Sequence, residues 1–199
     1  ENGGADWRMF NLRGVVDFYA FDPKDSKILY ANSSALFRST DAGRTWHAIY
    51  PPPSEITGVV SKGDHASEVI VTKDSTNRKM LALAIDPTDG KKLYAAISID
   101  KEVGYYFSDD HGATWTKDHM LPGGAKKIFI VPSSPDNDRT IYVTGKNSIA
   151  AKHNGTWFDN RGPSGVKMLT EVSGGFDDHE NKFIMYVIAG KSYFNPDGD

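Results

Sequence analysis

Short apolar segments separated by turn residues recur along the chain. The segment "VVDFYAFDPKDSKILYAN" is followed by three similar ones, "LALAIDPTDGKKLYAA", "KIFIVPSSPDNDRTIYVTG" and "TEVSGGFDDHENKFIMYVIAG". Each begins with residues rich in Val, Ile, Phe and Tyr, a composition typical of strands in a half-buried sheet. The break that follows contains Pro or Asp, which favour turns because Pro fixes φ and Asp hydrogen-bonds to nearby backbone. The pattern therefore predicts a repeated pair of strands joined by a turn.

Two further strands are predicted after each of the first three pairs. The third strand is expected at residues 35–38, 104–107 and 148–151, and the fourth begins at Trp46, Trp115 or Trp157. No window with a period of 3.6 residues is long enough to predict a substantial helix. Four antiparallel strands per unit predict an all-β fold, a β-propeller, in which the radial arrangement covers sheet edges that isolated units would leave open. A β-sandwich is the alternative.

The repeats also predict how the chain is divided. Propellers usually close with about four to eight blades, and only about three and a half are expected here. The remaining blades are therefore expected from a longer chain or from a second chain. The predicted regions are blade 1 at residues 14–50, a long inter-blade insertion forming a hairpin at 51–79, blade 2 at 80–119, blade 3 at 126–160 and the first half of blade 4 at 167–199.

One motif occurs twice in full, after the third strand of blades 1 and 2. "FRSTDAGRTW" and "YFSDDHGATW" share the frame Ser-x-Asp-x-Gly-x-Thr-Trp, and "KHNGTW" keeps only its last three fixed residues. The frame resembles the Asp-box, also called the bacterial neuraminidase repeat, of sialidases, xyloglucan-cleaving glycosidases, sortilin-type receptors and a photosystem assembly factor. The resemblance implies a β-propeller in which this turn lies away from the ligand site. We therefore expect the Asp and Gly to hold the turn and Trp46 and Trp115 to be buried.

Composition excludes several other classes of protein. The 199 residues are 39% apolar and 12% aromatic, which is sufficient for a globular core. The net charge of −3, with both signs interspersed, provides no basic surface for nucleic acid. The absence of cysteine excludes disulfides and thiolate chemistry. No apolar run approaches the roughly 20 residues needed to cross a bilayer.

The cellular location is predicted from the start of the chain and from the resemblance. The chain opens at Glu1 rather than Met, so we expect an upstream segment to have been removed, and a signal peptide fits that position. A secreted or periplasmic location is the prediction.

Cationic residues gather on the links between blades and at the strand starts that follow them. The first strand of each blade lines the central channel of a propeller, so these side chains are expected to converge there. Convergent Arg and Lys suit a carboxylate or sulfate, whereas ordinary solvated charges at strand ends are the alternative. The predicted ligand-binding residues are Arg13, Arg78, Lys79, Lys126, Lys127 and Arg161.

The candidate catalytic residues come from chemistry rather than from a motif. Hydrolysis of a glycosidic bond requires two carboxyl groups about 5 to 10 Å apart, and Asp17 and Glu171, both in first strands, are the candidate pair. His65 lies beside Asp64 in the insertion, where it can act as a general acid or base. No Arg-Ile-Pro tripeptide occurs, so no sialidase catalytic residue is assigned.

These observations predict a carbohydrate-active or glycan-binding propeller that recognises, and is able to cleave, a polysaccharide or acidic glycan. The alternative is a non-catalytic propeller that binds protein partners or assists assembly. "SPDNDRT" and "NPDGD" lack the full twelve-residue calcium-loop pattern with its closing Glu, and are interpreted as turns. No metal site, cofactor or nucleic-acid partner is expected.

Overall fold

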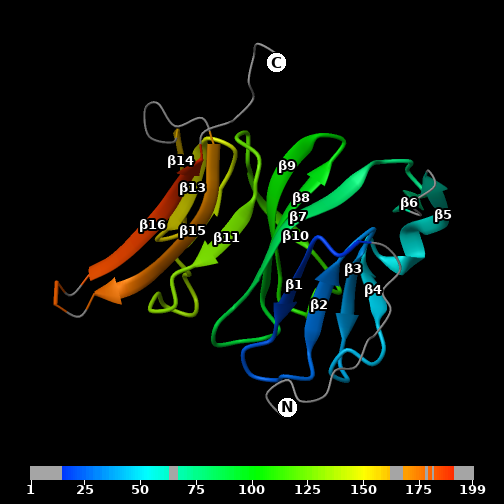
Figure 1. Cartoon of the computed structure of the whole chain (residues 1–199), viewed down its shortest axis with the longest axis horizontal. Helices are drawn as coiled ribbons and strands as arrows, with labels where there is room; N and C mark the ends of the chain where they lie inside the picture. The colour runs from blue at the N-terminus through cyan, green and yellow to red at the C-terminus, as the bar shows by residue number, and fades with distance from the viewer. Residues whose placement is uncertain (1–14, 63–66, 162–167, 178, 181, 191–199) are drawn as a thin grey trace, which may run out of the picture. The chain divides into compact units, whose positions relative to one another are not determined.

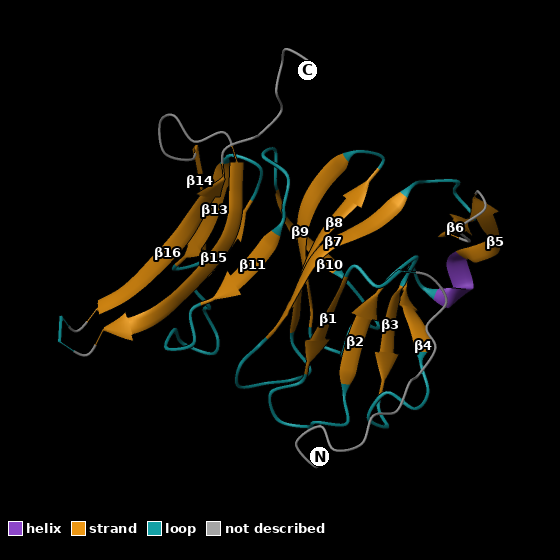
Figure 2. Ribbon diagram, viewed as in Figure 1, coloured by secondary structure: helices purple, strands orange, loops and turns teal. Residues whose placement is uncertain are grey.

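The computed structural model describes residues 15–62, 67–161, 168–177, 179–180 and 182–190 (Figure 1). Within these residues the chain consists of strands and turns, apart from a 3₁₀ turn, η1 (Pro53–Glu55) (Figure 2). The all-β class predicted from the sequence is therefore confirmed. The chain divides into two compact units, residues 1–77 and 78–199.

The first unit contains a four-stranded antiparallel sheet and a hairpin. The sheet follows chain order, so each strand pairs with the next one. Tyr30 and Leu36 are fully buried in this unit. The sheet strands are β1 (Phe18–Phe21), β2 (Leu29–Asn32), β3 (Leu36–Ser39) and β4 (His47–Tyr50), and the hairpin strands are β5 (Ile56–Lys62) and β6 (Ser67–Thr72).

The second unit contains two four-stranded antiparallel sheets and a two-stranded one, again in chain order. The first sheet consists of β7 (Arg78–Ile85), β8 (Leu93–Ile99), β9 (Glu102–Ser108) and β10 (Thr116–Met120). The second consists of β11 (Lys127–Ile130), β12 (Ile141–Thr144), β13 (Ser148–His153) and β14 (Thr156–Arg161). The last consists of β15 (Met168–Asp177) and β16 (Lys182–Gly190).

The two four-stranded sheets of the second unit pack against each other through apolar side chains. Ala82, Tyr94 and Tyr105 from the β7–β10 sheet share one buried cluster with Ile141 and Val143 from the β11–β14 sheet. The first strands lie together, since β11 contacts both β7 and β15. Burial of apolar surface, worth about 25 cal/mol per Å², therefore holds successive sheets together.

A buried ion pair also joins these two sheets. Asp86, in the turn after β7, accepts hydrogen bonds from Nε and Nη2 of Arg139, each at 2.7 Å, and from the Tyr94 hydroxyl at 3.0 Å. Asp86 is 1% exposed and Arg139 4%. Burial alone would raise the pKa of Asp86, but the hydrogen bonds from Arg139 and Thr88 outweigh it and hold that pKa far below its usual value. The carboxylate therefore remains ionised inside the protein.

The two Ser-x-Asp-x-Gly-x-Thr-Trp stretches form matching turns. In the first, the Asp41 carboxylate accepts hydrogen bonds from the Thr45 backbone N–H at 2.8 Å and hydroxyl at 2.7 Å, while the Gly43 N–H donates to Ser39 Oγ at 2.8 Å. The second repeats each of these bonds at Ser108, Asp110, Gly112 and Thr114. Trp46 and Trp115 at the ends of the turns are half-buried.

Gly43 and Gly112 have φ of 83° and 85°, a conformation that favours glycine. The Thr45 backbone N–H and hydroxyl lower the pKa of Asp41 to about 2. The residues shared by the two copies of the frame therefore build a turn through mutual hydrogen bonds.

Replacing Arg139 by leucine is expected to lower the free energy of unfolding by about 3–5 kcal/mol, because Asp86 would keep its charge in the interior without its main partner. Arg44→Leu, at an exposed turn position, is the matched control and should change stability by less than about 1 kcal/mol. Urea denaturation of the intact protein measures both. A similar small loss for the two variants would contradict the structural role of the ion pair.

Thr45→Val should raise the pKa of the Asp41 carboxyl, since the variant keeps the backbone donor but loses the hydroxyl donor that favours the charged form. An NMR titration of the Asp41 side-chain carboxyl carbon in the wild type and the variant measures this change. An unchanged pKa in the variant would show that the hydroxyl hydrogen bond does not stabilise the carboxylate.

Candidate functional site

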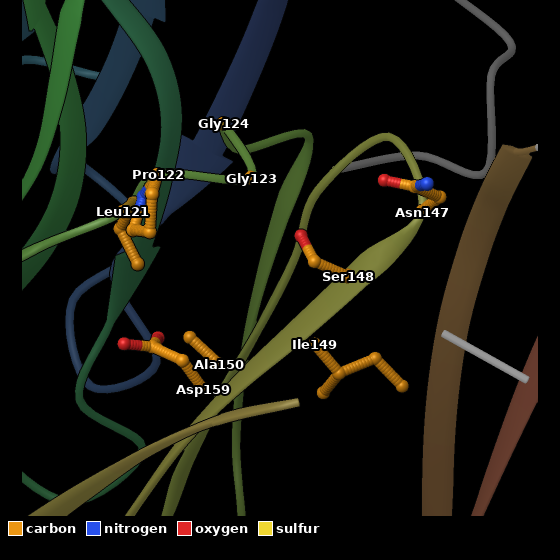
Figure 3. Close-up of a pocket in the computed structure, with 9 residues that line it drawn as sticks. All are labelled: Leu121, Pro122, Gly123, Gly124, Asn147, Ser148, Ile149, Ala150 and Asp159. Atoms are coloured by element: carbon orange, nitrogen blue, oxygen red, sulfur yellow. The ribbon is translucent and has the colours of Figure 1, made fainter. Parts of the chain in front are cut away.

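A pocket of about 550 Å³ opens in the second unit, within the range of about 300–1,000 Å³ typical of ligand sites. It lies between the link joining β10 to β11, the loop joining β12 to β13, and strand β14 (Figure 3). The first of these is a link between two sheets, and the second is a loop after the second strand of a sheet. The lining residues are Leu121, Pro122, Gly123, Gly124, Asn147, Ser148, Ile149, Ala150 and Asp159.

Two glycines allow the link and the loop to approach each other. The Gly145 N–H donates to the Ser148 carbonyl at 2.8 Å, and the Lys146 N–H donates to the Gly123 carbonyl at 3.2 Å. A Cβ atom on Gly123 would lie 1.8 Å from Ser148 Oγ, and one on Gly145 would lie 2.3 Å from the Gly123 carbonyl oxygen. Both contacts are too short for a side chain, so the shape of the pocket requires glycine at both positions.

Asp159 is the charged residue among the described lining residues, and its carboxylate is paired. His119 Nε2, on β10, lies 3.2 Å from Oδ1 and 3.1 Å from Oδ2 of Asp159. The His119 side chain is 23% exposed and that of Asp159 47%. His119 thus holds the Asp159 carboxylate, and the exposed part of the carboxylate can accept hydrogen bonds from a ligand.

Trp157 fixes the imidazole. Its ring is parallel to that of His119, with an angle of 4° and 4.6 Å between centroids, and it contacts the buried Tyr105 edge-on at 4.7 Å. Trp157 and Asp159 are two residues apart on β14, so they lie on the same face of the strand. One strand therefore supplies both the stacking surface for His119 and its carboxylate partner.

Asp118 completes the cluster. Its Oδ2 accepts hydrogen bonds from Lys152 Nζ at 2.7 Å and from Trp157 Nε1 at 2.9 Å. Burial would raise the pKa of Asp118, but the hydrogen bonds from Lys152 and Trp157 outweigh this effect and lower it. A carboxyl group held as an anion is poorly suited to donate a proton as a general acid.

A register shift in β10 between Lys117 and His119 explains how the adjacent residues Asp118 and His119 both reach the β11–β14 sheet. Regular alternation would send Asp118 and His119 to opposite faces. The irregularity changes the local direction of the side chains, and both residues bond to partners on β13 and β14. The cluster therefore depends on a local departure from the strand pattern.

The pocket is chemically suited to hydroxyl groups. The Asp159 carboxylate accepts hydrogen bonds, the Asn147 amide donates and accepts them, and the Ser148 hydroxyl does both. Leu121 and Ile149 add apolar surface. A sugar presents the same combination of hydroxyl groups and apolar ring faces.

Among the described residues, Arg78, Lys79, Lys126 and Lys127 do not line this pocket. Arg78 and Lys79 begin β7, Lys126 precedes β11 and Lys127 begins it. Arg78 and Lys127 are half-buried, and Lys79 and Lys126 are exposed. Arg161 ends β14, where its Cα pairs with that of Ser148, but its side chain lies outside the described part of the chain. Arg13 also lies outside the described residues, and convergence of these cations remains a prediction.

The described parts of the chain do not test the predicted catalytic residues. Asp17 is exposed in the first unit, where its carboxylate accepts a hydrogen bond from the Asn32 amide at 3.3 Å. Glu171 belongs to β15 in the second unit, and its side chain lies outside the described residues, as does all of His65. The proposed carboxyl pair and the role of His65 therefore remain predictions.

Sequence reasoning missed His119, Asp159 and Asn147. His119 and Asp159 are 40 positions apart, and neither belongs to the Ser-x-Asp-x-Gly-x-Thr-Trp frame. One signal was available: Asp159 follows Trp157, the last residue of the degenerate third frame, by two positions. That spacing on a strand places both side chains on one face.

Comparison with known proteins relates the chain to carbohydrate-active enzymes. No model of a known protein family matches the sequence. The xyloglucanase Xgh74A of Acetivibrio thermocellus is 28% identical over 136 residues, which cover 66% of this chain and 15% of that protein. The chain therefore spans about one seventh of the curated relative that it matches.

Solved structures show a similar fold. The crystal structure of an ancestral GH74 enzyme superposes with a TM-score of 0.56 at 13% identity, covering 81% of this chain and 21% of that one. The structure of YCF48 bound to D1 peptide has a TM-score of 0.46 at 14% identity, covering 74% of this chain and 40% of that one. The predicted fold class is confirmed as a partial β-propeller built from four-stranded antiparallel sheets.

Gly145→Ala is expected to destabilise the protein by about 1–3 kcal/mol, because the added methyl group meets a backbone carbonyl that no side-chain rotation can move aside. Gly175→Ala is the control, since no atom lies within 4 Å of the position of its added Cβ. Thermal unfolding of the two variants measures the difference. Equal melting temperatures would contradict the close approach of link and loop.

Proposed function

We propose that this chain forms part of a carbohydrate-active β-propeller and that the pocket beside Asp159 binds sugar residues of a polysaccharide. The observation that carries the proposal is the 28% identity to a xyloglucanase over 66% of the chain. By its name that relative acts on xyloglucan, so xyloglucan is the first candidate ligand. The fold shared with a GH74 enzyme and the hydroxyl-binding groups of the pocket support the same assignment.

The pocket itself is better suited to binding than to cleavage. Hydrolysis requires two carboxyl groups placed on either side of the scissile bond, and Asp159 is the carboxyl group among the described lining residues. The nearby Asp118 is bonded to Lys152 and Trp157 and has a lowered pKa. We therefore propose that the pocket holds the glycan and that any cleavage uses carboxyl groups elsewhere, with Asp17 and Glu171 still the candidates.

The proposal extends to the type of propeller and to the location of the protein. The hydrogen-bonded turns at Asp41 and Asp110 support membership of the Asp-box propellers, and such a propeller would complete its ring with blades from a longer chain or a second chain. A polysaccharide ligand supports a secreted or periplasmic location. Separately, no helix among the described residues combines the length and apolar character needed to cross a membrane.

The acidic-glycan form of the proposal rests on the cations rather than on the pocket. Lys126 and Lys127 lie at the start of β11, next to the link that lines the pocket, and would suit a carboxylate or sulfate. The negative charge of Asp159 favours an uncharged sugar within the pocket itself. A protein-binding propeller without glycan affinity is the alternative function.

The test uses the purified intact protein and two probes, xyloglucan oligosaccharide and an oligogalacturonate. Isothermal titration calorimetry measures the dissociation constant, and a reducing-sugar assay measures cleavage. Asp159→Asn should weaken binding of the xyloglucan oligosaccharide by about tenfold, since an ionised acceptor contributes about 1.5–3 kcal/mol to a hydrogen bond. The matched control is Asp109→Asn, an exposed carboxylate outside the pocket lining, which should leave binding unchanged.

The outcomes separate the candidate functions. Binding of the xyloglucan oligosaccharide that Asp159→Asn weakens supports the proposed site. Binding only of the oligogalacturonate supports the cationic surface and contradicts the pocket as the site. No binding of either probe by the wild-type protein would contradict glycan recognition and favour the protein-binding alternative.

A further inference from the structure

Asp159 lines the pocket, whereas the four side chains associated with it form an ordered series away from the ligand space. Lys152 bonds to Asp118, Asp118 to Trp157, Trp157 stacks on His119, and His119 bonds to Asp159. The series joins three strands of the two packed sheets, β10, β13 and β14. Water alone can solvate an exposed carboxylate. The series of side chains therefore points to a further role at Asp159.

The contact between His119 and Asp159 has a particular symmetry. Nε2 lies almost equally far from the two carboxylate oxygens, at 3.2 and 3.1 Å. A nitrogen centred between both oxygens opposes rotation of the carboxylate plane in either direction. A carboxylate offers about four lone-pair sites, so those directed away from His119 remain for ligand.

The imidazole is itself held in place. Its plane is parallel to Trp157 within 4°, and the indole is fixed by its Nε1–H bond to Asp118 and by its edge contact with Tyr105, which is 1% exposed. Lys152 Nζ lies 5.9 Å from the centre of the indole ring and also donates a hydrogen bond to Asp118. The orientation of Asp159 is therefore coupled to the buried core.

We propose that His119 is a positioning residue: it holds the Asp159 carboxylate so that its two free edges accept hydrogen bonds from neighbouring hydroxyl groups of a sugar. The proposal rests on the proposed function of the pocket and adds a residue that does not contact the ligand. Preorganised acceptors bind more tightly because less side-chain freedom is lost on association. Removal of the His119 donor should weaken binding although Asp159 remains.

A purely structural role for His119 makes the opposite prediction for two variants. His119→Phe keeps an aromatic ring for stacking on Trp157 but has no donor for Asp159. His119→Gln loses the ring but keeps an amide N–H at a position close to Nε2. If His119 positions Asp159, the Gln variant retains binding; if His119 only packs against Trp157, the Phe variant is the better substitute.

The experiment compares these variants in the intact protein at fixed pH, with the xyloglucan oligosaccharide as probe. Calorimetry gives the dissociation constant, and thermal unfolding shows that each variant is folded. We expect about tenfold weaker binding for His119→Phe and less than a threefold change for His119→Gln, on the scale of about 1.4 kcal/mol per factor of ten. His153→Gln, on β13 and bonded to Thr140, is the control and should not change binding.

Weaker binding by the Phe variant, together with near wild-type binding by the Gln variant, supports the positioning role. Equal binding by the wild type and the Phe variant overturns that role, and leaves the proposed function standing as long as Asp159→Asn weakens binding. No binding of the probe by the wild-type protein overturns both. The two proposals therefore fail in distinguishable ways.

Discussion

The candidate site depends on the packing of one four-stranded sheet against the next. The apolar cluster shared by β7–β10 and β11–β14 brings the outer strands β10 and β14 close enough for side chains from each to meet. The buried pair of Asp86 and Arg139 fixes the same two sheets at their turns. If the sheets moved apart, His119 would lose its stacking on Trp157 and its hydrogen bond to Asp159. The 121–124 link would also move away from β13 and β14, which line the other side of the pocket.

The pocket lies where the link between β10 and β11 and the loop between β12 and β13 are joined by a backbone hydrogen bond. Gly123 and Gly145 allow the link and the loop to approach each other, and backbone hydrogen bonds hold that approach. In the turns of the repeated frame, by contrast, the Asp41 and Asp110 carboxylates accept hydrogen bonds from residues of the same turn. The polar groups of the repeated frame thus stabilise the fold, while polar groups outside it are available to a ligand.

The fold was accessible from the sequence because its signals are local. Apolar segments of strand length, Asp and Pro at the breaks, and the two copies of the Ser-x-Asp-x-Gly-x-Thr-Trp frame each specify the structure of a few consecutive residues. These signals predicted the antiparallel sheets and the turn at Asp110, where the structure has the corresponding hydrogen bonds.

The site was not accessible in the same way because it depends on register between sheets. His119 meets Asp159 across 40 positions, and a strand irregularity beside Asp118 determines which way these side chains point. Neither property can be read from residue types along the chain. Arg78 and Lys127 were predicted to bind ligand because of their charge. The described lining of the pocket contains the carboxylate of Asp159 and neither of these cations.

On the proposed function, a sugar binds in the pocket against Asp159. A crystal structure of the intact protein with a xyloglucan oligosaccharide tests this most directly. We expect sugar density between the 121–124 link and Ser148, with hydroxyl oxygens about 2.7 Å from the Asp159 carboxylate. An oligosaccharide bound only at another surface, with the pocket free of sugar, would contradict the account.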